Sequence, residues 1–194
     1  HTNMTDDPIE AIARKIRQCR RLAITSHLRP DGDSLCSGMA LALAFESLGK
    51  TADYVITDPI PVPFNMFPDC RRIRVGQLDS TGYDAVVLLE CADVSRSGQT
   101  GLDAYYKINI DHHYSNSHYA DINWVDAEAP AVAELVLDLC GLEGAVETLG
   151  LRLRLHEAEP GTTSASFTLP ATRRPRTTAA ACRRSSIREF VHEP

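Results

Sequence analysis

Short apolar runs alternate with amphipathic stretches along the first 145 residues. Runs rich in β-branched residues predict strands at 22–25, 51–57 and 83–89, and the last of these is apolar enough to be central in a sheet. Apolar residues spaced three and four apart predict helices over 8–19, 34–48 and 128–142. Weaker patterns predict three further strands, at 71–75, 106–110 and 121–125. Alternating strands and helices predict an α/β fold with a doubly wound, mainly parallel sheet.

Local signals fix where several of these elements begin and end. Pro8 follows two acidic residues and suits the first turn of a helix, Ser34 is a candidate N-cap, and Gly49 is a candidate C-cap. Three prolines between Asp58 and Phe64 remove backbone donors, so an irregular loop with a short turn is expected over 60–69.

The composition changes near residue 150. Residues 151–194 hold eight Arg against four Glu, a net charge of +4, which leaves −10 of the total −6 to residues 1–150. This tail is crowded with Arg, Thr, Ala, Pro and Ser and has no sustained apolar period, which is typical of disorder. It is either a genuine basic tail that touches nucleic acid or an out-of-frame translation that begins between Leu142 and Leu155.

Polar side chains capable of binding metal follow the first predicted strand. His27, Asp31 and Asp33 lie in a loop shaped by Pro30 and Gly32, just before a helix. Imidazole with carboxylates suits Mn²⁺ and similar ions, and the helix N-terminus favours an anion such as phosphate. A solvated loop with a capped helix would show the same residues.

Two other strand ends carry the same kinds of side chain. Asp111, His112 and His113 follow the strand at 106–110, and Glu90 and Asp93 follow the strand at 83–89. The carboxyl ends of parallel strands share one edge of a sheet, so these groups are expected to converge on one metal site. Either Glu90 or Asp93 could be the ligand from the middle strand.

Composition narrows the function classes. The apolar fraction of 43% suits a globular core, and a net charge of −6 argues against a general nucleic-acid or membrane binder. Six cysteines without a Cys-x-x-Cys pair, and the absence of a signal peptide or membrane span, indicate free thiols and a cytoplasmic location.

Taken together, these motifs resemble the DHH phosphoesterase superfamily, and within it the bifunctional oligoribonuclease and pAp phosphatase (nanoRNase) family. The resemblance rests on His27-Leu-Arg-Pro-Asp-Gly-Asp33-Ser-Leu-Cys-Ser37, on Ile110-Asp-His-His-Tyr-Ser-Asn116 and on the segment 121–134. It covers roughly residues 8–145. The chain departs from the family pattern at Cys36, where Gly is usual, and at Glu90, where Asp is usual.

The resemblance implies a site with two Mn²⁺ ions, for which Mg²⁺ or Co²⁺ can substitute. The implied metal ligands are His27, Asp31, Asp33, Glu90 and His112, with Asp33 bridging. His113 would face the substrate phosphate and Asp111 would orient the site, so that Asp33, Asp111 and His113 form the implied catalytic set. Arg96 and Asn116 are weaker candidates for substrate binding, while His118 and Trp124 are expected to be a surface residue and a core residue.

The implied substrates are short RNA oligonucleotides, which are cut to mononucleotides, and 3′-phosphoadenosine 5′-phosphate (pAp). No membrane partner is expected, and a homodimer is a possible assembly. A RecJ-type exonuclease, a cyclic-dinucleotide phosphodiesterase and a catalytically incomplete DHH binding domain remain alternatives. The family's later Asp-Thr-Gly and Gly-Gly-Gly-His motifs are absent from this sequence. We therefore expect residues 1–150 to be a DHH domain that is incomplete at its C-terminal end, followed by the tail over 151–194.

Overall fold

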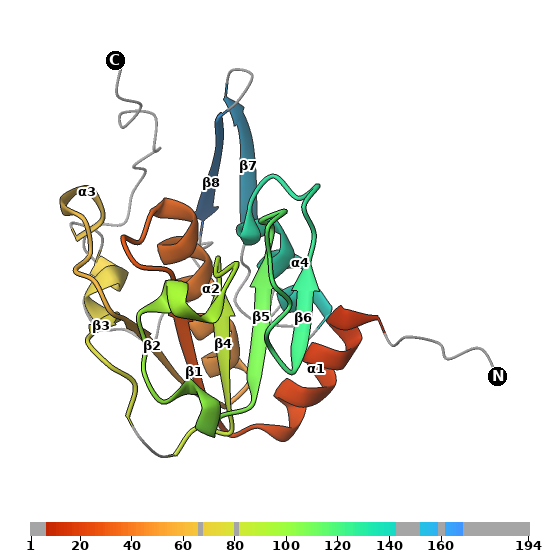
Figure 1. The fold of residues 1–194 in the computed structure, drawn as a ribbon. Coiled ribbons are helices and arrows are strands. Elements are labelled where there is room, and N and C mark those ends of the chain that lie inside the picture. The colour runs from red at the N-terminus through yellow and green to blue at the C-terminus, as the bar shows by residue number, and fades with distance from the viewer. Residues whose placement is uncertain (1–6, 66–67, 80–81, 143–151, 159–161, 169–194) are drawn as a thin grey trace, which may run out of the picture.

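The computed structural model describes residues 7–65, 68–79, 82–142, 152–158 and 162–168. Its centre is a sheet of six parallel strands in the order β3-β2-β1-β4-β5-β6 (Figure 1). The strands are β1 (Arg21–Ser26), β2 (Thr51–Ile56), β3 (Arg74–Val75), β4 (Ala85–Leu89), β5 (Lys107–Asp111) and β6 (Ile122–Val125). The predicted α/β fold with a parallel sheet is confirmed.

The helices lie on one face of this sheet. The α-helices are α1 (Pro8–Gln18), α2 (Gly32–Ser47), α3 (Val62–Asn65) and α4 (Val132–Leu142), and the 3₁₀ turns are η1 (Pro68–Arg72), η2 (Val94–Ser97) and η3 (Leu102–Ala104). Apolar side chains of α1, α2 and α4 share one core with Ile24, Val87 and Ile110 of the strands. The smaller core on the opposite face, around Val86 and Leu88, is covered by loops, η2 and η3. A doubly wound sheet usually carries helices on both faces, so this face differs from the expected architecture.

The order of the strands indicates where on the sheet a ligand would bind. All five residues of β4 are buried, which agrees with the prediction of a central strand. The chain runs outward from β1 to β3, returns to β4 beside β1, and then runs outward again to β6. In open parallel sheets, ligands bind outside the carboxyl ends of the strands where the order reverses. Here that position lies between β1 and β4.

The start of α2 differs from the sequence prediction. Asp31, and not Ser34, is the N-cap: its carboxylate accepts a hydrogen bond from the Ser34 backbone N–H at 3.0 Å. Ser34 Oγ accepts one in return from the Asp31 backbone N–H, also at 3.0 Å. This reciprocal capping box lets the helix begin two residues earlier than predicted.

Helix α4 begins at Val132, four residues after the predicted start at Glu128. Asp126 accepts a hydrogen bond from the Glu128 backbone N–H at 3.0 Å, and this local turn replaces the first helical turn. The predicted loop over 60–69 contains the short helix α3 and the beginning of η1, and the predicted edge strand shortens to β3.

Two segments of the tail also differ from the irregular structure predicted for it. Strands β7 (Arg152–Ala158) and β8 (Thr162–Thr168) pair antiparallel. Alternating Arg and Leu at 152–155 gives the period of two that suits a strand. The described residues do not include 143–151, 159–161 and 169–194. The domain boundary near residue 150 and the origin of the tail therefore remain predictions.

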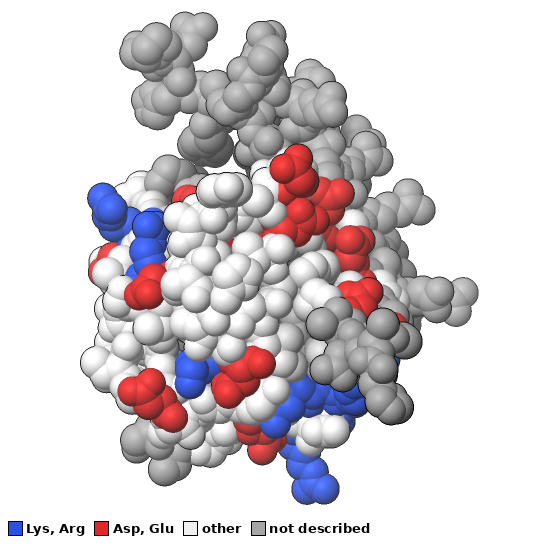
Figure 2. All heavy atoms as spheres, turned by 45° about the vertical axis from the view of Figure 1, so that its right-hand side comes forward, with Lys and Arg blue, Asp and Glu red and all other residues white. Residues whose placement is uncertain are grey.

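The part of the chain that the structure describes contains no helix long and apolar enough to cross a membrane. Cys19, Cys36, Cys70 and Cys91 form no disulfide, as the sequence predicted. On the face shown in Figure 2, acidic side chains gather at the upper right, while basic side chains lie along the lower part and in a separate group at the upper left.

Candidate metal centre

The loop after β1 presents His27 and Asp31 as a pair. Nδ1 of His27 lies 2.7 Å from the Leu28 carbonyl oxygen and donates to it, so in the neutral imidazole Nε2 is the nitrogen available as a ligand. That Nε2 lies 3.7 Å from Asp31 Oδ2. Asp31 raises the pKa of His27. Burial alone would raise the pKa of Asp31, but hydrogen bonds from His27 and Ser34 outweigh it and lower this pKa to about 2.

Asp33 lies in the first turn of α2 and also caps α4. Its carboxylate accepts hydrogen bonds from the backbone N–H groups of Val132 at 2.8 Å and Ala133 at 3.1 Å, and from Ser37 Oγ at 3.0 Å. Asp33 thus accepts hydrogen bonds from two of the backbone N–H groups at the start of α4, as an N-cap side chain does. These contacts fix the carboxylate between the two helices.

Glu90 follows β4 and is 3% exposed. Its φ of 60° lies in the left-handed region, which is costly for a residue with a side chain and is typical of functional sites. Oε1 is buried and has no hydrogen-bond partner. Burial and the neighbouring Asp33 raise the pKa of Glu90 to about 7. A buried carboxylate beside another carboxylate is unfavourable unless a cation joins them.

His112 follows β5 and faces Glu90. Its Nδ1 donates to the Ala129 carbonyl oxygen at 3.0 Å, so Nε2 is directed at Glu90 Oε2, 3.5 Å away. The Glu90 carboxylate raises the pKa of His112 to about 9. As for His27, a backbone carbonyl selects the tautomer whose Nε2 can bind metal.

Asp111 holds the other histidine. This fully buried carboxylate accepts hydrogen bonds from His113 Nδ1 at 2.7 Å, from the His112 backbone N–H at 2.9 Å and from Asn116 Nδ2 at 2.6 Å. Nδ1 of His113 lies 3.7 Å from Glu90 Oε2, but its proton is already donated to Asp111. Nε2 of His113 is therefore the ring nitrogen that remains available to a ligand.

The predicted site residues fall into groups. Within the described ranges, ligand atoms of Glu90, His112 and His113 form the one set of three or more that lie within 4.8 Å of one another. Asp33 joins this set through Glu90, and His27 with Asp31 forms the neighbouring pair on the β1 loop. Asp93 is turned away: it caps η2 by accepting a hydrogen bond from the Ser95 backbone N–H at 2.9 Å. The geometry therefore favours Glu90 over Asp93 as a ligand.

The model of the DHH family, N-terminal domain, matches residues 21–160. The chain belongs to the DHH family. This match contains every strand of the sheet and every residue of the candidate centre.

Two curated relatives are similar to part of this chain. One is the bifunctional oligoribonuclease and PAP phosphatase NrnA of Thermus thermophilus, 32% identical over 121 residues, which are 62% of this chain and 36% of that protein. The other is a probable bifunctional oligoribonuclease and PAP phosphatase NrnA of Streptococcus mutans, 26% identical over 66% of this chain and 41% of that protein. The DHH chain thus spans well under half the length of these relatives.

A solved structure confirms the fold. The exopolyphosphatase-related protein of Bacteroides fragilis aligns with a TM-score of 0.68 at 20% identity, over 76% of this chain and 47% of that one. At this identity the similarity concerns the architecture, and it leaves the substrate of this chain open.

The residues of this DHH chain fit a divalent cation. Two imidazole Nε2 atoms and three carboxylates, one of which has a buried oxygen without a partner, give the mixed nitrogen and oxygen donors that divalent ions such as Mn²⁺ accept. Histidine rings oriented by backbone carbonyls are the usual support for such ligands.

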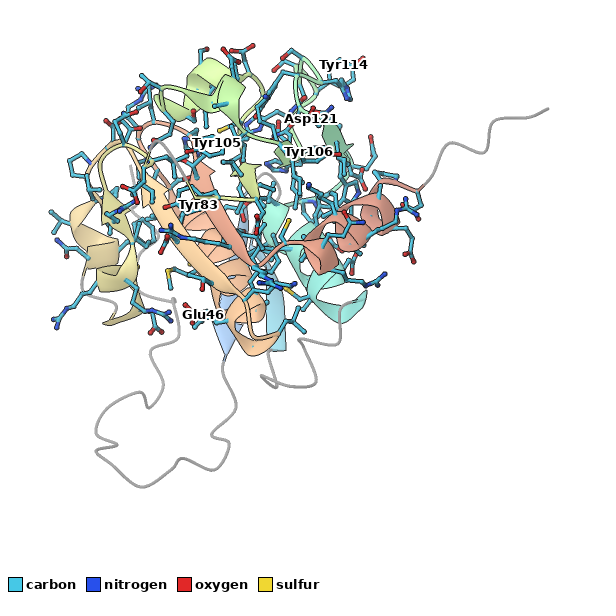
Figure 3. All side chains as sticks on the ribbon, turned by 90° about the horizontal axis from the view of Figure 1, so that it is seen from below. Glu46, Tyr83, Tyr105, Tyr106, Tyr114 and Asp121 are labelled. Atoms are coloured by element: carbon cyan, nitrogen blue, oxygen red, sulfur yellow. The ribbon has the colours of Figure 1, made fainter. Side chains whose placement is uncertain are left out.

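Of the two predicted substrate-binding residues, one points into the protein and the other is exposed. Asn116 turns its amide inward, to Asp111 and to Asn109 Oδ1 at 2.7 Å, so in this structure it braces the loop. Arg96 is exposed on η2. Tyr114, directly after His113, is 96% exposed and projects from the molecule in Figure 3. Sequence reasoning missed the contact between the His112 ring and the backbone of Ala129. It also missed the supporting role of Ser37, and neither contact has a sequence signature.

Proposed function

We propose that this chain is a Mn²⁺-dependent phosphoesterase that releases mononucleotides from short oligoribonucleotides and removes a phosphate from pAp. The proposal is carried by Glu90, a buried carboxylate with one oxygen lacking a partner, held beside Asp33 and His112 where the strand order reverses. The activities named for the two NrnA relatives support the substrate class.

In this proposal His27, Asp31, Asp33, Glu90 and His112 would hold the ions. Bound Mn²⁺ supplies a Lewis acid that activates water and offsets charge on phosphoryl oxygens. Asp111 anchors His113 through Nδ1, so Nε2 can contact the scissile phosphate or pass a proton to the leaving oxygen. Hydrogen bonds from the Val132 and Ala133 backbone N–H groups hold the Asp33 carboxylate in place.

The test is hydrolysis by the full chain with Mn²⁺ and after EDTA treatment. The substrates are pAp, a 5′-phosphorylated diribonucleotide, a 20-nucleotide RNA, a cyclic dinucleotide and bis(p-nitrophenyl) phosphate. We expect Mn²⁺-dependent release of phosphate from pAp and of mononucleotides from the dinucleotide, and little cleavage of the long RNA. Preference for the long RNA would favour the RecJ-type alternative, and preference for the cyclic dinucleotide would favour the phosphodiesterase alternative.

Asp33→Asn is the decisive variant, because it removes the charge and keeps an oxygen for the α4 amides. Loss of a direct ligand should reduce the rate by about 100-fold or more. Unchanged activity would refute the assignment of Asp33. Calorimetric Mn²⁺ binding by the wild-type chain without any hydrolysis would instead favour the catalytically incomplete binding domain.

A further inference from the structure

Basic residues are scarce where the proposed substrate must bind. Six segments lead from the carboxyl ends of the strands to the next α-helix or strand: 27–31, 57–61, 76–84, 90–106, 112–121 and 126–131. They contain ten Asp and Glu, of which Asp84 and Asp121 lie at the amino ends of the strands, where they accept hydrogen bonds from the Arg21 and Lys107 backbone N–H groups. Against the other eight stand only two Arg or Lys, which are Arg29 and Arg96. A substrate with two phosphates would meet net negative charge there, so any fixed cation on these segments gains importance.

Both guanidinium groups are available. In the described part of the chain neither Arg29 nor Arg96 makes an ion pair or a side-chain hydrogen bond, and both residues are exposed. Other arginines on the same molecule are paired: Arg72 with Glu46, and Arg74 with Asp79. The guanidinium groups of Arg29 and Arg96 thus form no ion pair within the described ranges, although Asp58 accepts a hydrogen bond from the Arg29 backbone and Asp93 lies three residues before Arg96.

The backbone of Arg29 is held in a costly conformation. Its φ of 55° is left-handed, which for a residue other than Gly is usually maintained only by surrounding contacts. Asp58, on the segment after β2, accepts a hydrogen bond from the Arg29 backbone N–H at 2.8 Å. Arg29 also lies at the tip of the turn that His27 and Asp31 close with their 3.7 Å contact. The Arg29 backbone is therefore fixed beside the candidate metal centre, two residues from His27 and two from Asp31.

Three further contacts join the Arg29 loop to η2 and to the segment after β2. The Leu28 backbone N–H donates to the Arg96 carbonyl oxygen at 2.7 Å. Leu28 packs so closely on Gly98 that an added Cβ there would lie 2.5 Å from its methyl carbon. Thr57 Oγ1 donates to the Ser97 carbonyl oxygen at 2.8 Å, which ties in the segment after β2. Three segments thus form one braced unit that carries both arginines.

We propose that Arg29, together with Arg96, binds the non-scissile phosphate of the substrate. The inference rests on the proposed function and adds a subsite for a second phosphate group. The ligand chemistry is a phosphate monoester or diester one nucleotide unit away from the phosphate at the metal centre. A guanidinium on a fixed backbone suits it, because its planar array of donors matches two phosphate oxygens.

The experiment compares a ligand with two phosphates and a ligand with one. Calorimetry measures binding of pAp and of AMP to the full chain in Ca²⁺, for wild type, Arg29→Gln, Arg96→Gln and Arg20→Gln. Arg20 is the matched control, since it is exposed at the start of β1, at the opposite edge of the sheet. We expect Arg29→Gln to weaken pAp binding about 10-fold and AMP binding less than about twofold, because only pAp loses a contact with a charged donor.

Two further variants keep the test decisive. Arg29→Lys retains the charge without the planar fork and should lie between wild type and Arg29→Gln. Arg29→Asn tolerates the left-handed backbone and replaces Arg29→Gln if that variant unfolds at a lower temperature than wild type.

Equal losses for pAp and AMP, or a loss for pAp no greater than that of Arg20→Gln, would overturn the subsite. Failure of the wild-type chain to bind pAp would overturn it as well. Binding of pAp with the expected Arg29 dependence, but without hydrolysis in Mn²⁺, would leave the subsite standing and refute only the proposed function.

Discussion

Two charged clusters lie on the same sheet, and they are built in opposite ways. In the first, the Arg21 cluster, Arg21 pairs with Asp53 at 2.9 Å, and Arg74 pairs with Asp79 at 3.2 Å. The Tyr83 hydroxyl donates to Asp53 at 3.0 Å and accepts from Arg74 at 3.3 Å. Figure 3 shows Tyr83 and Tyr105 close together on this side of the sheet, where their ring centroids are 6.0 Å apart. Each carboxylate here has a permanently charged partner.

The second cluster is the candidate metal centre, where carboxylates face one another and histidines. Glu90 is buried beside Asp33, its Oε1 has no partner, and its backbone is left-handed. No Arg or Lys pairs with Glu90 among the described residues. The comparison separates two uses of charge: the Arg21 cluster is complete in itself, whereas the centre has the features of a site that a cation completes.

The largest expected difference concerns Mn²⁺ binding by Glu90→Gln. Removing a direct ligand should weaken binding by about 100-fold or more, while the metal-free protein keeps or gains stability because a desolvated charge is lost. Calorimetry with MnCl₂ and thermal unfolding in EDTA measure the two effects. Asp93→Asn is the control and should bind Mn²⁺ like wild type. If instead the Asp93 variant lost the metal, the ligand assignment would be reversed.

A smaller effect is the pH dependence of stabilisation by Mn²⁺. The folded state holds extra protons because the pKa of Glu90 is raised to about 7 and that of His112 to about 9. Stability of the metal-free protein from these groups is therefore present at low pH and falls as pH rises from about 5 to 9. Mn²⁺ competes with the same protons, so the increase in Tm on adding it should grow over this range.

Thermal unfolding at pH 6.0, 7.5 and 9.0, with and without Mn²⁺, checks this expectation. In Glu90→Gln both the pH dependence and the Mn²⁺ effect should shrink. A Tm increase that is independent of pH in the wild type would contradict the proposed competition at Glu90 and His112.

The smallest effect is expected in the Arg21 cluster. Asp53→Asn should lower the free energy of unfolding by roughly 0.5–1 kcal/mol, because the paired side chains of Arg21 and Asp53 are 39% and 36% exposed and solvent screens them. Urea unfolding measures the loss, and Mn²⁺ affinity should stay unchanged. A change in Mn²⁺ affinity would show that the two clusters are energetically linked.

The fold was predictable because its signals are local. The buried run of β4 and the stripe of α1 follow from hydrophobic periodicity, and the strand ends that carry His27, Glu90 and His112 could be read as one edge of a sheet. Features set by distant residues were not predictable. Helix α4 starts late, where Asp33 caps it from 99 residues upstream, and nothing within 126–131 signals that partner.

The candidate site was predictable in residue type and less so in orientation. Backbone carbonyls of Leu28 and Ala129 decide which nitrogen of His27 and His112 is available, and a carbonyl carries no side-chain signature. The left-handed backbone at Glu90 and Arg29 was also hidden, because neither residue type favours it. The inward turn of Asn116 depends on Asp111 being fully buried, which the motif alone does not show.

The bonds from Asp33 to Val132 and Ala133 have a consequence for protein synthesis. A nascent chain whose first 100 residues have emerged already holds His27, Asp31, Asp33 and Glu90, but it lacks the amides that hold the Asp33 carboxylate. Full assembly of the site therefore waits until translation has passed residue 133, since contacts distant in sequence form only after both partners exist. In the finished protein the same two amide protons can serve as nuclear magnetic resonance reporters of the Asp33 carboxylate, since they contact it directly although they are about 100 residues away in the sequence.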